Sequence, residues 1–176
     1  IMKRKNIFPS YSPSMDIQVS SNFERLLYEI NDRDTNLVKK QMNEFKVDGN
    51  FQITQDQLNK INNLFAAFKI SDFETLNVIK KIYIDHKYML DPHSAIGYGA
   101  VQKAIEQKII SNDCPIISLA CAHPAKFPQV IKKSIGITPE FPLHLDQIMS
   151  RKEYFKTIDP NLKDVQEYII KSMRML

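Results

Sequence analysis

The stretch "PIISLACAHPAKF", residues 115–127, decides how the fold is interpreted. Residues 115–122 carry no charge, which is typical of a strand covered on both faces of a parallel sheet. A thiol, an imidazole and a lysine then follow at Cys121, His123 and Lys126. Ligands of open α/β sheets bind beyond the carboxyl ends of the strands. The end of this predicted strand is therefore a candidate binding site.

Composition excludes several classes of protein. The 176 residues suffice for one domain with a core, and 43% hydrophobic and 25% charged residues are ordinary for a globular chain. The net charge is +4, but Lys and Arg are spread along the chain, so no nucleic-acid partner is expected. No apolar run approaches the ~20 residues of a membrane span, so no membrane partner is expected either. Two cysteines, Cys114 and Cys121, too far apart on an extended strand to bridge, favour reduced thiols and a cytoplasmic location.

Helix-start signals recur along the chain. A Ser or Thr followed three residues later by Glu or Gln is a capping-box spacing, and Asp before Pro is a good start for a helix. Short strands are expected near residues 65–70 and 153–158. These signals predict helices that start at the following residues: Ser21, Asp34, Thr54, Ser71, Asp91 and Asp159, with a further helix after Pro124 that ends near Gly136.

Together, the predicted helices and strands indicate a helix-rich α/β fold with an incomplete parallel sheet. One convincing buried strand, at 115–122, needs parallel neighbours that this chain hardly offers. We therefore expect another chain, or a segment absent from this sequence, to complete the sheet. Glycine is scarce, with only Gly49, Gly97, Gly99 and Gly136, so no glycine-rich phosphate loop is expected.

Cys121 and His123 lie two residues apart, so in a strand they point the same way. A Cys–His nucleophilic pair is one interpretation, although no third group stands at a recognisable spacing. A small buried thiol that packs like alanine, next to a His that caps the following turn, is the alternative that spacing alone favours. One Cys and one His are too few ligands for a metal site.

Four further residues are candidates for an active-site wall or for substrate contacts. Asp91 and His93 begin a predicted helix, whose free N–H groups favour anions. Ordinary capping is the favoured explanation for Asp91, whereas His93 is not needed for capping. Lys126 is either a phosphate contact, a catalytic amine or a surface charge. Asn22 stands among polar residues beside a predicted core segment, where ligand contacts and interdomain hydrogen bonds are both consistent with the sequence.

Three blocks in order resemble one known family. They are "SPSMDIQVSSNFERLLYE" at 12–29, "LDPHSAIGYGAV" at 90–101 and "LACAHPAKFPQVI" at 119–131. Together they are similar to the C-terminal part of threonine synthase, a pyridoxal 5'-phosphate (PLP) enzyme of the tryptophan-synthase-β-like fold type, fold type II. The resemblance spans essentially the whole chain, 1–176, as a single C-terminal portion.

The resemblance implies a carbon–oxygen lyase of threonine biosynthesis. Such enzymes convert O-phospho-L-homoserine and water to L-threonine and phosphate, with PLP as the electron sink. In the family, the lysine that holds PLP and the loop that binds its phosphate lie upstream of these blocks. Lys126 matches a different lysine. We therefore expect no catalytic residue in this chain, and an N-terminal part, in the same or a separate chain, as its partner.

Cys121 departs from the family pattern. The resemblance puts Cys121 and His123 beside the cofactor, and the family usually has Thr at position 121, with its hydroxyl facing the pyridine nitrogen. A thiol is a weaker hydrogen-bond partner than a hydroxyl. A decayed, non-catalytic remnant that serves as an interaction module is therefore a second hypothesis, and a free-standing Cys–His hydrolase is a third. Exposed apolar area where the N-terminal part would dock predicts self-association.

Overall fold

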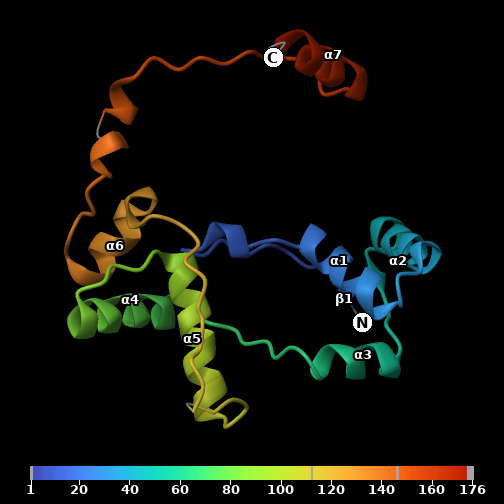
Figure 1. Ribbon diagram of the computed structural model, residues 1–176, viewed down its shortest axis with the longest axis horizontal. Helices are drawn as coiled ribbons and strands as arrows, with labels where there is room; N and C mark the ends of the chain where they lie inside the picture. The colour runs from blue at the N-terminus through green and yellow to red at the C-terminus, as the bar shows by residue number, and fades with distance from the viewer. Residues whose placement is uncertain (1, 112, 146, 174–176) are drawn as a thin grey trace. The chain divides into compact units, whose positions relative to one another are not determined.

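The computed structural model describes residues 2–111, 113–145 and 147–173, and it is built mainly from helices (Figure 1). The chain divides into two compact units, residues 1–140 and 141–176. The first unit contains the following elements: β1 (Met2–Lys3), the 3-10 helix η1 (Pro13–Met15), α1 (Ser21–Ile30), α2 (Thr35–Val47), β2 (Asn50–Phe51), α3 (Gln55–Asn62), α4 (Asp72–His86), α5 (Pro92–Glu106), the 3-10 helix η2 (Pro124–Lys126) and α6 (Pro128–Ile135).

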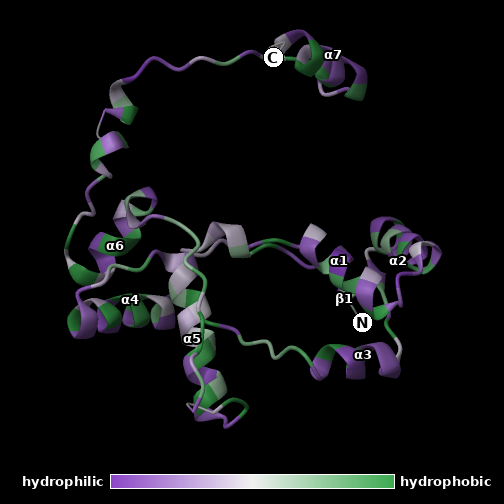
Figure 2. Ribbon diagram, in the orientation of Figure 1, coloured by the Kyte–Doolittle hydropathy of each residue, from purple (hydrophilic) through white to green (hydrophobic). Residues whose placement is uncertain are grey.

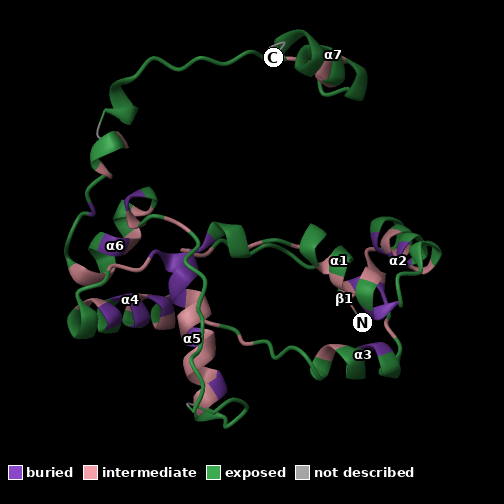
Figure 3. Ribbon diagram, viewed as in Figure 1, coloured by how far each residue is buried: buried purple, intermediate pink, exposed green. Residues whose placement is uncertain are grey.

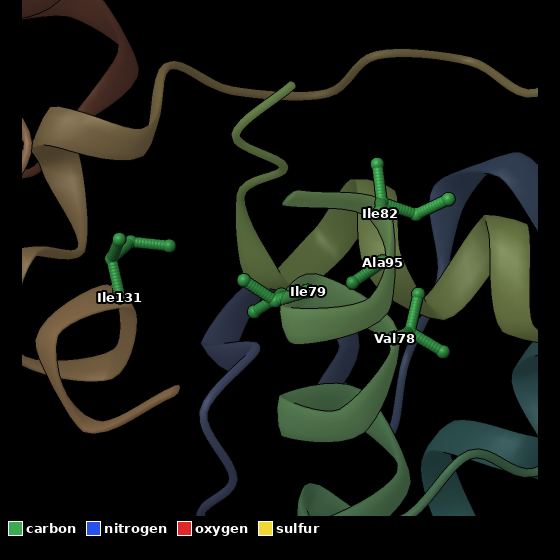
Figure 4. Close-up of a cluster of buried hydrophobic side chains, with 5 residues drawn as sticks. All are labelled: Val78, Ile79, Ile82, Ala95 and Ile131. Atoms are coloured by element: carbon green, nitrogen blue, oxygen red, sulfur yellow. The ribbon is translucent and has the colours of Figure 1, made fainter. Parts of the chain in front are cut away.

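Helices α4, α5 and α6 pack around one apolar cluster. The buried members come from all three helices, and in Figure 4 Ile79 of α4 and Ile131 of α6 point toward one another. Both side chains are fully buried. Ser134 of α6 also donates a hydrogen bond to the carbonyl oxygen of Leu76 on α4, at 2.7 Å. The cluster consists of Val78, Ile79, Ile82, Ala95 and Ile131.

A second cluster joins α1, α2 and the short sheet. Leu27, Ile30, Phe45 and Phe51 are its buried members, and the rings of Phe45 and Phe51 pack edge to face at 5.8 Å. Next to it, the buried amides of Asn31, Gln41 and Gln57 bond to one another, with Asn31 donating to Gln41 at 2.8 Å.

The capping signals at Thr54 and Ser71 are confirmed, because both form complete capping boxes. Asp91 caps α5 as the sequence predicted. Helix α1 begins at Ser21 as expected, but the capping box of Ser21 and Glu24 does not form, since Ser20 is the N-cap and its side chain makes no capping bond. In the second unit, which contains η3 (Leu143–Leu145), η4 (Ile148–Ser150) and α7 (Leu162–Ser172), the N-cap of α7 is Asn161, two residues beyond the expected Asp159.

The predicted strand at 115–122 does not form. The described residues contain a single sheet, in which β1 and β2 pair antiparallel, and residues 115–122 have no regular structure. Ile117 and Leu119 are 85% and 77% exposed. Figure 2 shows this segment as largely hydrophobic, and Figure 3 shows it as exposed beside α5. The physical reason is that a strand requires hydrogen-bonding neighbours, and an apolar run cannot supply them by itself. The strands expected at 65–70 and 153–158 are absent as well.

Candidate functional site

The start of α5 is a deeply buried polar region of the first unit. Asp91, His93 and Ser94 are 1%, 5% and 3% exposed, and Figure 3 shows the beginning of α5 as buried. Local sequence explains the geometry: Asp91 has extended backbone and accepts from the N–H groups of His93 and Ser94, while Pro92 occupies the first helical position, where no N–H is needed. Burial of a carboxylate requires hydrogen-bonding partners, and Asp91 has several.

Asp91 holds the segment that precedes η2. Its Oδ2 accepts from the backbone N–H of Ala122 at 3.2 Å and from the hydroxyl of Ser94. The Ser94 oxygen in turn accepts from the backbone N–H of Cys121 at 2.8 Å. Farther along α5, a Cβ added at Gly97 would lie 3.3 Å from the Ser118 hydroxyl. The extended segment therefore lies against α5, and the absent side chain of Gly97 permits that close approach.

His93 connects a third part of the chain to this network. Its Nε2 lies 3.2 Å from the backbone nitrogen of Ser14, which can only donate, so Nε2 is the acceptor. The ring proton is thereby assigned to Nδ1, which lies 3.1 Å from Asp91 Oδ1 and donates to it. The imidazole also packs on the Phe127 ring, with centroids 4.8 Å apart. Residues near 14, 91–94 and 121–127 thus meet around one histidine.

The segment before η1 has anchors of its own on α4 and α6. The backbone N–H of Tyr11 donates to Asp72 at 3.1 Å, and Lys133 of α6 donates to the Tyr11 hydroxyl while lying 4.9 Å from the ring centroid. The hydrogen bond with Tyr11 raises the pKa of Lys133. Ser12, next along the chain, is 1% exposed and has a hydroxyl without a hydrogen-bond partner among the described residues.

The structure brings some of the predicted site residues together and leaves others apart. Asp91 and His93 are bonded to each other, and Asp91 reaches the backbone beside Cys121. His123 accepts from the N–H of Ala125 and lines a pocket of about 350 Å³ with Tyr88, Met89, Pro124, Pro139 and Glu140.

Lys126 and Asn22 take no part in this network. Lys126 is exposed on η2, and Asn22 lies on α1, where its side chain accepts from Arg25. In the described part of the chain, no hydrogen bond joins either residue to Asp91. Sequence reasoning missed the roles of Ser94, Ser14 and Phe127, although Ser94 stands three residues after a capping Asp, where a hydroxyl can reach the cap.

Both cysteines are free, as the sequence predicted, but both are exposed, so the expectation of a buried Cys121 thiol that packs like alanine is wrong. The Cys121 sulfur lies 3.5 Å from the Leu119 carbonyl oxygen, and its backbone N–H bonds to Ser94. No group of three or more His, Cys, Asp or Glu side chains in residues 2–111, 113–145 and 147–173 is arranged to hold a metal ion. None of the helices in those ranges has the length and apolar character needed to cross a membrane.

Comparison with known proteins identifies the family. The family model for the C-terminal region of threonine synthase matches residues 94–169. Threonine synthase from Pseudomonas aeruginosa is 35% identical over 167 residues, which are 94% of this chain and 35% of that protein. The chain belongs to the threonine synthase family. The part that it matches is the C-terminal one, and it spans about a third of the length of that relative.

Solved structures agree with this family. PLP-bound threonine synthase from Brucella melitensis is 41% identical with a TM-score of 0.78, over 95% of this chain and 35% of that one. Threonine synthase from yeast is 29% identical with a TM-score of 0.75, over 96% of this chain and 37% of that one. The helix-rich architecture expected for this part of a fold type II PLP enzyme is thereby confirmed, and PLP is the cofactor of the family.

Proposed function

We propose that this chain forms the C-terminal part of a threonine synthase, which converts O-phospho-L-homoserine and water to L-threonine and phosphate. It would act with an N-terminal part, either in the same polypeptide or as a separate chain, and in the cytoplasm, where the two exposed free thiols would stay reduced. The observation that carries the proposal is the meeting of the three blocks at the start of α5. Contacts of Asp91, His93 and Ser94 reach Ser14 in the first block and Ala122 and Phe127 in the third.

The chemistry of Cys121 is compatible with a position beside a PLP ring. The two backbone bonds at Cys121 and Ala122 attach the segment to α5, while the Cys121 side chain stays exposed. A neutral thiol is a weak partner that suits an unprotonated ring nitrogen. The resemblance gives Cys121 that position, with His123 on the neighbouring wall. When bound, PLP would supply the electron sink for loss of the phosphate and addition of water.

The N-terminal part would provide the remaining contacts to the cofactor and substrate, including the loop that binds the cofactor phosphate. The four glycines of this chain form no phosphate loop, and Gly97 and Gly99 lie inside α5. A Cβ at Gly99 would lie 3.3 Å from the Ile70 side chain, so this glycine permits the segment before α4 to pack against α5. Among the predicted wall residues, exposed Lys126 offers a charge to the substrate phosphate, and Asn22 remains a candidate at the α1 surface.

The test is phosphate release. The chain is joined to, or mixed with, the N-terminal part of the Pseudomonas aeruginosa relative, and release of phosphate from O-phosphohomoserine is measured with PLP present. We expect turnover in the combination and none with either part alone. A Cys121→Thr variant, which restores the usual family residue, should remain active.

Absence of phosphate release in both the native and the Cys121→Thr combination, with both parts folded, would contradict the proposal. It would favour a non-catalytic remnant, which is the second hypothesis that Cys121 motivates. Release in the Cys121→Thr combination only would show that the thiol itself disables the site.

A further inference from the structure

Every hydrogen-bond partner of the Asp91 carboxylate is a donor. Oδ1 faces the N–H groups of His93 and Ser94, at 2.9 and 3.4 Å, and the Nδ1 of His93. Oδ2 faces the Ser94 hydroxyl and the Ala122 N–H. An amide has a single acceptor oxygen, so asparagine would have to turn an NH₂ group toward one of these donor sets. Capping of α5 needs only Oδ1. The second oxygen, Oδ2, binds the backbone of Ala122 directly and that of Cys121 through Ser94.

The Oδ2 side fixes two consecutive residues of the extended segment. Ala122 is bound directly, and Cys121 is bound through the Ser94 oxygen. A hydroxyl has one proton, and Ser94 donates it to Asp91, so its lone pairs are left for the Cys121 N–H. Removal of the carboxylate would free the Ser94 hydroxyl to rotate and would weaken both attachments.

The Oδ1 side extends the same network to the first block. Asp91 holds the His93 proton on Nδ1, and Nε2 is then an acceptor for the Ser14 N–H. The carboxylate thus determines the polarity of hydrogen bonds that reach both the segment near η1 and the segment before η2.

We propose that Asp91 is a positioning residue, which fixes the backbone of Cys121 and Ala122 and thereby the direction in which the Cys121 thiol is presented. Its importance for catalysis rests on the function proposed above, in which Cys121 faces the cofactor. The fixation itself is a property of this chain and is testable without cofactor.

The experiment compares two capping aspartates. Asn and Asp are about equally good N-caps, so a residue that only caps tolerates Asp→Asn. Among the described residues, the Asp34 side chain bonds only to the N–H groups of Asn36 and Leu37 at the start of α2, which makes Asp34→Asn the matched control for Asp91→Asn. Amide hydrogen exchange is measured residue by residue in the chain itself.

With the NH₂ group turned toward Ser94 and Ala122, Asp91→Asn should speed exchange at Cys121 and Ala122 by about tenfold or more. Ala122 loses its bond to a charged acceptor, and the Cys121 bond weakens because the Ser94 hydroxyl is free to rotate. Asp34→Asn should change exchange at Asn36 and Leu37 by about twofold at most. Unchanged exchange at Cys121 and Ala122 in a folded Asp91→Asn chain would overturn the proposal.

A second variant keeps the proposal testable if Asp91→Asn fails to fold. Ser94→Ala removes the link to Cys121 but leaves Asp91 bonded to Ala122, and alanine suits the helix. It should speed exchange at Cys121 more than at Ala122, whereas equal or no effects would contradict the network.

Failure of the proposed function is distinguishable from failure of this inference. In the combination with the N-terminal part, Asp91→Asn should move the absorbance band of bound PLP and lower kcat more than it changes KM. If the native combination binds no PLP but the exchange results are as expected, the proposed threonine synthase function is contradicted and the positioning of Cys121 by Asp91 still holds.

Discussion

Substitution of Ile79 by alanine tests whether the α4–α5–α6 cluster is the core of the first unit. The side chain is fully buried and packs with Ile82, Ala95 and Ile131. The substitution removes every side-chain carbon beyond Cβ, and lost burial at about 0.8 kcal/mol for each comes to about 2.4 kcal/mol. The cavity left behind adds to this, so we expect the free energy of unfolding to fall by about 3 to 4 kcal/mol.

The assay is urea unfolding followed by far-ultraviolet circular dichroism, and the control lies on the same helix. Ile84 is 56% exposed, so Ile84→Ala makes the same chemical change with the same gain in helix propensity but little lost burial. It should lower the free energy of unfolding by less than about 0.5 kcal/mol. Equal losses for Ile79→Ala and Ile84→Ala would show that this cluster is not the core of the first unit.

Three further predictions follow from single features. A hydrogen bond from Lys103 lowers the pKa of Glu74 from 4.5 to about 2, so the pair contributes stability above pH 4.5 that is lost as the pH falls through about 2. The free energy of unfolding, measured against pH, should fall less between pH 4.5 and about 2 in Glu74→Gln than in the native chain. The same pH profile in both chains would contradict this role of the Glu74–Lys103 pair. Gly136 has φ of 75° with open space around it, so Gly136→Ala should cost about 1 kcal/mol from backbone strain alone; a stability gain would contradict this. Exposed Ile117 and Leu119 should make the isolated chain self-associate, and light scattering that shows a monomer at micromolar concentration would count against it.

Sequence reasoning succeeded where the structure depends on neighbours within a few residues. The capping boxes at Thr54 and Ser71 and the cap at Asp91 are of this kind, because each side chain bonds to N–H groups two or three positions away. At the start of α1, Ser20 and Ser21 offer the same chemistry one residue apart, and the pattern selected the wrong one.

Prediction from the sequence failed where residues far apart in the chain determine the local structure. The apolar composition of residues 115–122 predicts a buried strand, but burial needs neighbouring strands that composition does not supply, and Leu119 is exposed instead. For a related reason, only part of the hydrogen-bond network around Asp91 could be predicted from the sequence. Its capping bonds are local, whereas its bonds to Ala122 and, through His93, to Ser14 cross 31 and 79 positions.

Whether this chain completes a PLP enzyme is tested by the absorbance spectrum of PLP with this chain, alone and with the N-terminal part of the Pseudomonas aeruginosa relative. We predict that a band of protein-bound PLP appears in the combination and not with either part alone. The same band should persist in Lys126→Gln, because Lys126 is not the lysine that holds the cofactor in the family. Spectra of the mixture that equal the sum of the separate parts, with both parts folded, would contradict the account that this chain completes a threonine synthase.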